Sequence, residues 1–340
     1  MTPQLYVATN GLSVWSSRDL GETISRMPST TGLYSGSQVW ALAVHPEAPG
    51  VLLAGTDSGI YRLDQAAQRW THLPSPMDDM LVTALAFSPG DPGVILAGTQ
   101  PSALFRSEDA GESWTAIDTA MKPYVVSGFF QGEDPDAPSR KTPGLVKHWT
   151  RVTQIAFDAQ DPRLAWAGVE IDAAWRSRDG GKSWARTSEG FKNEDIHGLA
   201  VVHDGGRLLY ATTAGGLHLS RDDGATWTMK PIDSPWQYVR SIVPKADGSG
   251  TMFMTNGNGP PGSDGRIFRS RDFGATWEQL PLPGRVESSA YFLAAHPADP
   301  NLLFLAATLG QLYRSSDGGD TWTALPRRLG EVRAVAWMPG

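Results

Sequence analysis

Short apolar runs separated by turns repeat along this chain of 340 residues. In one period, the apolar run 39–44 is followed by a turn, a second apolar run at 51–56 and a turn that contains glycine. A third run then ends in an aromatic residue followed by Arg and Ser, as at 105–107. Runs of this length, bounded by Gly, Pro and Asp, are typical of β-strands. The pattern therefore predicts an all-β protein made of repeated four-stranded antiparallel units.

A phrase of the form Ser-x-Asp-x-Gly-x-(Ser/Thr)-Trp closes the third run of most periods. Its six copies occupy 17–24, 107–114, 177–184, 220–227, 270–277 and 315–322. The first copy has Ile24 in place of Trp, and a seventh stretch, 61–70, has lost most of the phrase. In a tight turn Asp and Ser bond nearby backbone amides and Gly supplies a positive φ. We therefore interpret Asp179, Asp222 and Asp317 as turn residues and not as catalytic carboxylates.

The number of periods predicts a seven-bladed β-propeller that occupies residues 1–340 as one domain. The first strands of the blades are expected at 39–44, 82–87, 152–157, 196–201, 239–243, 291–295 and 332–337. The last of them has no partners after it, because the chain ends at Gly340. We expect the N-terminal runs 5–8 and 12–15 to pair with this C-terminal strand. That pairing would close the ring and leave no sheet edge bare.

The repeated phrase is the Asp-box, or BNR repeat, and the whole chain resembles proteins that carry it. They include sialidases, xyloglucan-cleaving enzymes with two propellers, sortilin-type receptors and a photosystem II assembly factor. The resemblance implies a propeller with the boxes between third and fourth strands, away from the functional face. Because these proteins share a repeat and not a chemistry, the resemblance implies the fold far more than the function.

One position near the start of each first strand departs from the repeat. It is polar or aromatic and differs between blades, whereas the positions after it are mostly Ala, Leu, Ile and Val. Around the ring this slot holds Arg333, Trp40, Thr83, Thr153, His197, Arg240 and Tyr291. Packing alone would keep the slot uniform, so we predict that these side chains gather at one mouth of the central channel. Convergent polar groups in a cleft are typical of a ligand site.

Arg240, Tyr291 and Arg333 are predicted on three consecutive blades. Two guanidiniums and a phenol that converge there would bind a carboxylate, sulfate or phosphate group. Trp40 would offer a flat face to a sugar or an aromatic ring. The further candidates for substrate binding are Thr83, Thr153 and His148.

Acid–base chemistry is predicted for His197, Glu170 and Tyr291. Such a role requires pKa values shifted by a partly dry pocket, which the channel mouth would provide. A metal site made of His148, His197 and Glu170 is a weaker alternative, because the sequence spacing does not enforce its geometry. We therefore predict neither a metal nor another cofactor.

Two insertions are predicted at the same mouth of the central channel as the slot residues. The longer one, 120–149, joins two blades and carries Phe129 and Phe130, and a long aromatic loop is typical of a lid or a binding loop. The shorter one, 256–266, is rich in Gly and Pro and lies between a second and a third strand.

Charge and composition exclude several classes of partner. The formal net charge of −7 argues against nucleic acid and anionic lipid, which both attract basic proteins. The chain has no cysteine, so disulfides and thiolate chemistry are excluded. We see no signal peptide and no apolar run long enough for a membrane span, and we expect a cytoplasmic protein.

Two functions remain open at this point. The first, which we favour, is a hydrolase or lyase similar to sialidases and other glycosidases, acting on an anionic, sugar-like or aromatic-acid small molecule. The second is a non-catalytic propeller that binds a protein or peptide, with Phe129 and Phe130 as its anchor.

Overall fold

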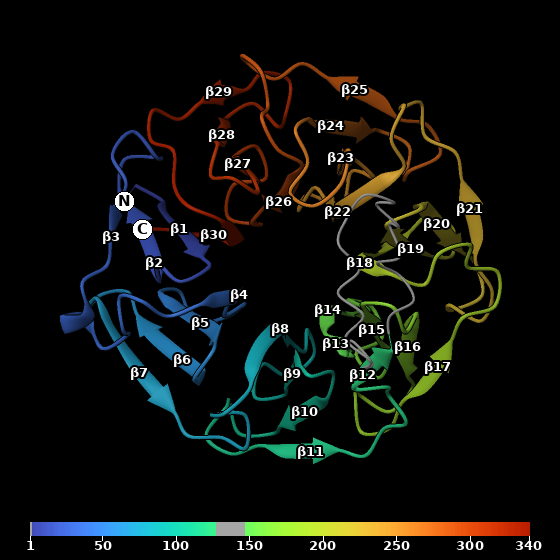
Figure 1. The fold of residues 1–340 in the computed structure, drawn as a ribbon, viewed down its shortest axis with the longest axis horizontal. Helices are drawn as coiled ribbons and strands as arrows, with labels where there is room; N and C mark the ends of the chain where they lie inside the picture. Colours follow the sequence, from blue (N-terminus) through green and yellow to red (C-terminus); the bar gives the residue numbers. More distant parts are fainter. Residues whose placement is uncertain (1, 127–146) are drawn as a thin grey trace, which may run out of the picture.

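The chain forms a ring of seven four-stranded antiparallel sheets, as the computed structural model shows for residues 2–126 and 147–340 (Figure 1). One strand of each sheet faces the central channel. These inner strands are β4 (Val39–Val44), β8 (Leu81–Phe87), β14 (Val152–Phe157), β18 (Ile196–His203), β22 (Tyr238–Pro244), β26 (Ala290–Ala294) and β30 (Val332–Met338). The predicted seven-bladed β-propeller is confirmed.

The other strands of six blades follow each inner strand in chain order toward the outside. The second strands are β5 (Val51–Thr56), β9 (Ile95–Gln100), β15 (Ala165–Val169), β19 (Arg207–Thr213), β23 (Met252–Gly257) and β27 (Leu303–Ala307). The third strands are β6 (Gly59–Asp64), β10 (Leu104–Ser107), β16 (Ala174–Ser177), β20 (Gly216–Ser220), β24 (Gly265–Ser270) and β28 (Leu312–Ser315). The fourth strands are β7 (Arg69–Leu73), β11 (Thr115–Ile117), β17 (Ala185–Thr187), β21 (Thr228–Lys230), β25 (Glu278–Leu280) and β29 (Thr323–Ala324).

Outside the blades, the described residues contain one two-stranded hairpin and one short helical turn. The hairpin pairs β12 (Tyr124–Val126) with β13 (Lys147–Trp149). The turn is the 3-10 helix Ser29–Thr31. None of the described helical structure has the length and apolar character that crossing a membrane requires.

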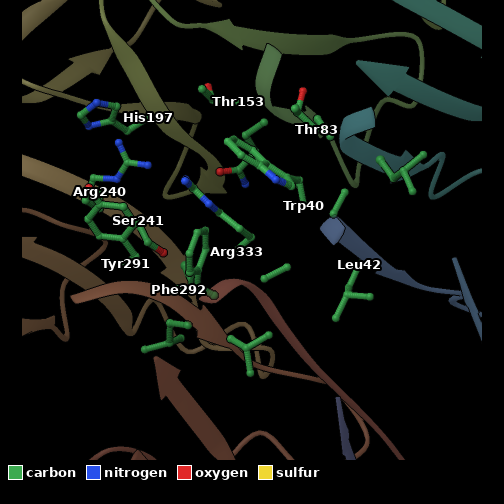
Figure 2. Close-up of a pocket in the computed structure, with 18 of the residues that line it drawn as sticks. Trp40, Leu42, Thr83, Thr153, His197, Arg240, Ser241, Tyr291, Phe292 and Arg333 are labelled. Atoms are coloured by element: carbon green, nitrogen blue, oxygen red, sulfur yellow. The ribbon is translucent and has the colours of Figure 1, made fainter. Parts of the chain in front are cut away.

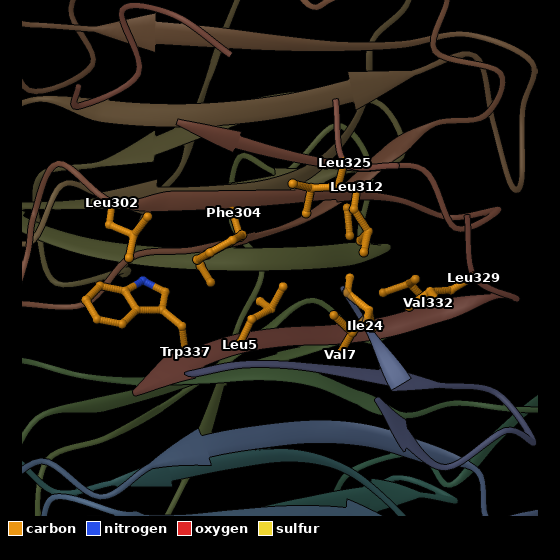
Figure 3. Packing of buried hydrophobic residues seen from close by; sticks show 12 residues of the cluster. Leu5, Val7, Ile24, Leu302, Phe304, Leu312, Leu325, Leu329, Val332 and Trp337 are labelled. Carbon is orange, nitrogen blue, oxygen red and sulfur yellow. The ribbon is translucent and has the colours of Figure 1, made fainter. Parts of the chain in front are cut away.

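The seventh blade is assembled from both ends of the chain. Its sheet runs from β30 through β1 (Gln4–Thr9) and β2 (Val14–Ser17) to β3 (Ser25–Arg26). β30 and β1 pair antiparallel, with Trp337 opposite Leu5. Both side chains are buried in one apolar cluster with Phe304 of the neighbouring blade (Figure 3). The predicted closure of the ring is confirmed, and apolar packing between blades reinforces it.

Each Asp-box is held by hydrogen bonds within its own turn. In the box at 220–227, Asp222 Oδ1 accepts from Ser220 Oγ (2.7 Å) and from the Thr226 N–H (2.9 Å). Asp222 Oδ2 accepts from Thr226 Oγ1 (2.7 Å), and the Gly224 N–H donates to Ser220 Oγ (2.8 Å). The same set of bonds recurs in the other five boxes. The box carboxylates therefore stabilise turns, as the sequence predicted.

Candidate functional site

Every inner strand carries a bulge near its start, and the bulge falls on the slot that the sequence singled out. In β4, for example, the register with β5 shifts between Val39 and Ala41. The residues at the seven shifts are Arg333, Trp40, Thr83, Thr153, His197, Arg240 (with Ser241) and Tyr291. A bulge leaves the extra residue unpaired and redirects its side chain. Repetition of this bulge explains why one divergent position faces the channel in all seven blades.

The seven slot residues line one cavity in the centre of the ring (Figure 2). The cavity encloses about 240 Å³. That volume is close to the lower end of the range for small-ligand sites, roughly 300 to 1,000 Å³. The side chains of Gln154, Ser241 and Phe292 also contribute to the lining. The described lining contains no Asp or Glu side chain.

Arg240 is the most deeply buried cation of the cavity, with 9% of its surface exposed. Its Nη1 donates to the Tyr238 hydroxyl (3.1 Å), and its Cζ lies 4.0 Å from the centre of the Tyr291 ring. Within the described residues no carboxylate reaches ion-pair distance of Arg240, whereas Glu170, Asp195 and other nearby acids pair with other basic groups. Glu170 and Asp195 still act on Arg240 from a greater distance. A buried charge with no carboxylate at ion-pair distance is costly, so such a group is rarely kept for stability.

Arg333 approaches the cavity from the closing blade. Its Nη2 is paired with Glu331, and its Cζ lies 3.9 Å from the centre of the Trp40 ring. Burial lowers the pKa of Arg333 to about 10, which leaves the guanidinium charged at neutral pH. Arg333 Nε and Trp40 Nε1 are buried and have no hydrogen-bond partner among the described residues. The Trp40 ring also contacts the Arg151 guanidinium (4.8 Å), so its role as a sugar platform stays a prediction.

His197 lies beside Arg240 with both ring nitrogens occupied. Nδ1 contacts the Val239 carbonyl oxygen (2.7 Å) and Nε2 contacts Asp195 Oδ2 (3.2 Å). Burial, and then the nearby Arg240 charge, lower the pKa of His197, while its contacts with Asp195 and Val239 act in the opposite direction. Its predicted acid–base role would require one of these two contacts to open.

Thr83 and Thr153 line the cavity, but their hydroxyl groups have partners in the backbone. Thr83 Oγ1 donates to the Val152 carbonyl oxygen (2.7 Å), and Thr153 Oγ1 donates to that of Ile196 (2.8 Å). Each bond joins one blade to the next. The hydroxyl protons of both residues are therefore already used to hold neighbouring blades together.

Glu170 and the longer insertion contribute less to the described cavity. Glu170 Oε2 forms an ion pair with Arg151 Nε (2.9 Å), and Glu170 is not part of the lining. His148 lies in β13 opposite Val125, and the structure describes only its backbone. Residues 127–146, which include Phe129 and Phe130, lie outside the described residues. In the described residues no group of three or more acidic or His side chains is arranged to hold a metal.

The shorter insertion is fixed to the entry of the β26 blade. Asn258 Oδ1 accepts from the N–H groups of Ser263 (2.7 Å) and Asp264 (3.1 Å). The Ser289 N–H donates to the Pro261 carbonyl oxygen (2.7 Å). These bonds give the predicted loop a defined shape and attach it to Ser289, which lies two residues before Tyr291.

Tyr238 is the main site residue that the sequence did not reveal. Its hydroxyl lies 3.1 Å from Arg240 Nη1 and 3.2 Å from the Tyr291 hydroxyl. The sequence did contain a signal for Tyr238. It lies two residues before the slot residue Arg240, and residues two apart in a strand lie on the same face. This second position is also divergent and mostly polar, and it holds Gln38, Leu81, Arg151, Asp195, Tyr238, Ser289 and Glu331.

Comparison with known proteins agrees with this architecture. Residues 215–338 match the family described as "Sortilin, neurotensin receptor 3". A xyloglucanase from Paenibacillus sp is 29% identical over an alignment of 236 residues that covers 60% of this chain and 21% of the xyloglucanase. By sequence, this chain is related to a xyloglucanase. It spans about a fifth of the length of that relative.

Solved structures show the same fold. A GH74 enzyme of Niastella koreensis superposes with a TM-score of 0.62 at 21% identity, over 84% of this chain and 45% of the enzyme. A structure described as YCF48 bound to D1 peptide has a TM-score of 0.56 at 17% identity, over 85% of this chain and 81% of YCF48. At these identities the likeness shows a shared fold and does not show a shared chemistry.

Proposed function

We propose that this protein is a glycosidase-like enzyme, a hydrolase or lyase, that acts on a small anionic sugar or aromatic acid at the channel mouth. The observation that carries the proposal is Arg240, a buried cation without a described carboxylate partner. The sequence relation to a xyloglucanase supports the glycosidase-like class. The anionic substrate is inferred from the charge of the cavity.

The charges around the cavity point to one anionic group on the ligand. Arg151 is paired with Glu170, Arg333 with Glu331, and His197 with Asp195. Arg240 is therefore the cation available to a ligand carboxylate, and a guanidinium suits that geometry because it offers two parallel donors. Arg333 Nε is a donor without a partner among the described residues, so the ligand would also supply an oxygen acceptor.

The lining favours elimination over hydrolysis by two carboxylates. Glycosidases of the usual type place two carboxyl groups at the scissile bond, and the described lining has none. In an elimination next to a carboxylate, Arg240 would neutralise the carboxylate while a base removes the adjacent proton. Tyr291 would then protonate the oxygen of the leaving group, and a carbon–carbon double bond would form. His197 is the proposed base, and Glu170 would act only through Arg151.

Ligand titration tests the anion site. We expect glucuronate and benzoate to bind the purified protein in calorimetry, and glucose and neutral xyloglucan oligosaccharides not to bind. Arg240→Met should remove binding of the acids. The matched control, Arg163→Met, changes an exposed arginine in a surface turn and should bind as the wild type does. Equal binding of glucose and glucuronate, or unchanged binding in Arg240→Met, would contradict the proposal.

Turnover tests the enzymatic part separately. A panel of uronides, neutral glycosides, lactones and acyl esters would be assayed for both hydrolysis and the ultraviolet absorbance of an unsaturated product. We expect activity with uronides that Arg240→Met and Tyr291→Phe abolish. Binding of acids without turnover of any panel member would reject the enzyme and keep the anion site.

That last outcome would favour a peptide-binding propeller. The observation behind this second function is the fold shared with YCF48, whose structure is described as bound to a peptide. A peptide with a free C-terminal carboxylate would reach Arg240, whereas the same peptide with an amidated end would leave the cation unpaired. Tighter binding of the free acid in fluorescence anisotropy would support it, and equal binding of both forms would not.

A further inference from the structure

We propose that Tyr238 is a positioning residue that directs the hydroxyl proton of Tyr291 toward a ligand in the cavity. The inference rests on the proposed function only in taking the cavity as the ligand site. It starts from one chain of contacts: Arg240 Nη1 lies 3.1 Å from the Tyr238 hydroxyl, which lies 3.2 Å from the Tyr291 hydroxyl.

The chemistry of these groups gives the chain a direction. A guanidinium has donors and no acceptor, so Arg240 must donate to the Tyr238 oxygen. The described residues offer the Tyr238 proton no acceptor other than the Tyr291 oxygen. When Tyr238 donates to that oxygen, the Tyr291 proton has to point elsewhere. Tyr291 lines the cavity and Tyr238 does not, so the Tyr291 proton is the one that a ligand can accept.

The reverse direction would leave a donor without a partner. If Tyr291 donated to Tyr238, the Tyr238 oxygen would accept two bonds and its own proton would have no described acceptor. A buried or half-buried hydroxyl without an acceptor costs free energy, whereas the proposed order satisfies every donor once a ligand oxygen is bound. Hydrogen bonds in such a chain also polarise one another, which strengthens the last donor.

The fold keeps Tyr238 in place independently of these bonds. Tyr238 is the first residue of β22 and lies opposite Gly257 of β23. Its ring meets the His197 ring edge-on, with 4.8 Å between the ring centres. Because the strand pairing and the His197 ring both fix Tyr238, its side chain needs little reorganisation when a ligand binds. Donors that are already in place stabilise charge that develops on a bound ligand. The ligand class follows: besides its carboxylate for Arg240, it carries an oxygen acceptor for Tyr291.

The first test needs no ligand. Ring-labelled tyrosine is incorporated into the protein, and the Cζ signal of Tyr291 is identified by its absence in Tyr291→Phe. We expect Tyr238→Phe to move this signal in the direction of a lost accepted hydrogen bond. Tyr61→Phe, a distant substitution of the same kind in β6, should leave it unchanged. A Tyr291 signal that stays in place in Tyr238→Phe would overturn the proposal, whatever the cavity binds.

The second test is a double-mutant cycle with glucuronate as the probe. Loss of either hydroxyl breaks the same chain, so Tyr238→Phe and Tyr291→Phe should each weaken binding about tenfold, and the double variant should be no weaker than Tyr291→Phe. A double variant about a hundredfold weaker would show two independent contacts and overturn the relay. If the wild type does not bind glucuronate, the proposed ligand class fails, while the Cζ signal still decides the relay.

Discussion

The Asp-boxes and the channel mouth use polar residues in opposite ways. In the box at 220–227 the Asp222 carboxylate finds its donors within the same turn. At the mouth, Arg240 has no described carboxylate partner, and the Arg333 Nε donor has no hydrogen-bond partner among the described residues. Both regions recur with the same period. A polar group that repeats and satisfies itself maintains the fold, whereas one that diverges and stays unsatisfied marks the place where a ligand is expected.

The largest expected effect comes from Arg240→Met. Because Met fills the space of the Arg240 side chain but cannot bind an anion, the substitution should weaken glucuronate binding at least about a hundredfold. It should change the free energy of unfolding by less than about 2 kcal/mol. Urea denaturation and calorimetry measure the two quantities. Arg163→Met is the control and should change neither. A variant that is destabilised by several kcal/mol would place Arg240 among the structural residues.

Asp222→Ala should have the opposite profile. It removes the acceptor of three hydrogen bonds in a turn, and the free energy of unfolding should fall by about 1 to 2 kcal/mol. Binding of glucuronate should stay at the wild-type value, since the box lies between a third and a fourth strand. Asp222→Asn, which keeps one acceptor oxygen, should lose less stability. Weaker glucuronate binding in Asp222→Ala would break the distinction between the two regions.

Thr83→Val tests a slot residue whose hydroxyl group is hydrogen-bonded to the backbone of the next blade. The hydroxyl donates to the Val152 carbonyl oxygen, so its loss should lower the free energy of unfolding by about 1 kcal/mol and leave glucuronate binding unchanged. Thr115→Val, an exposed substitution in β11, is the control and should change stability by less than about 0.5 kcal/mol. A clear loss of binding in Thr83→Val would support the substrate contact that the sequence predicts for Thr83.

The smallest expected effect is that of acid on the carboxylate of an Asp-box. The Thr23 hydroxyl, its N–H and Ser17 lower the pKa of Asp19 from 3.8 to about 2. A carboxylate with a lowered pKa in the folded state stabilises it above pH 3.8, and this contribution disappears as the pH falls toward 2. An NMR titration of the Asp19 carboxyl measures the pKa, and Thr23→Val should return it toward 3.8. A pKa unchanged by Thr23→Val would show that the box bonds do not hold the charge.

The sequence was informative about the fold because local chemistry recurs in it. Six boxes and seven apolar first strands determine the number of blades, and the unpartnered run at 332–337 implies the closure with the N-terminus. The slot was also visible, and all seven of its residues line the cavity. Their divergence could be read because the rest of each strand is uniform.

The partners of the site residues were less accessible to sequence reasoning. Tyr238 was missed because only the slot itself was compared between blades, and its contact with Tyr291 joins residues of different blades. Glu170 was predicted near the mouth, but the structure pairs it with Arg151. Which side chains satisfy one another depends on distances across the ring, and spacing along the chain does not define them.

The strands, the turns, the number of blades and the ring of divergent positions are all readable in the amino-acid sequence. These follow from local rules: the alternation of apolar runs, the turn chemistry of Asp and Gly, and the repetition of one period. The folded ring was needed to show that the slot residues occupy bulges, that Glu170 is paired, and that Arg240 has no described carboxylate at ion-pair distance. The reason is physical: the free energy of a polar group depends on its partners and its burial, and the closed ring sets both.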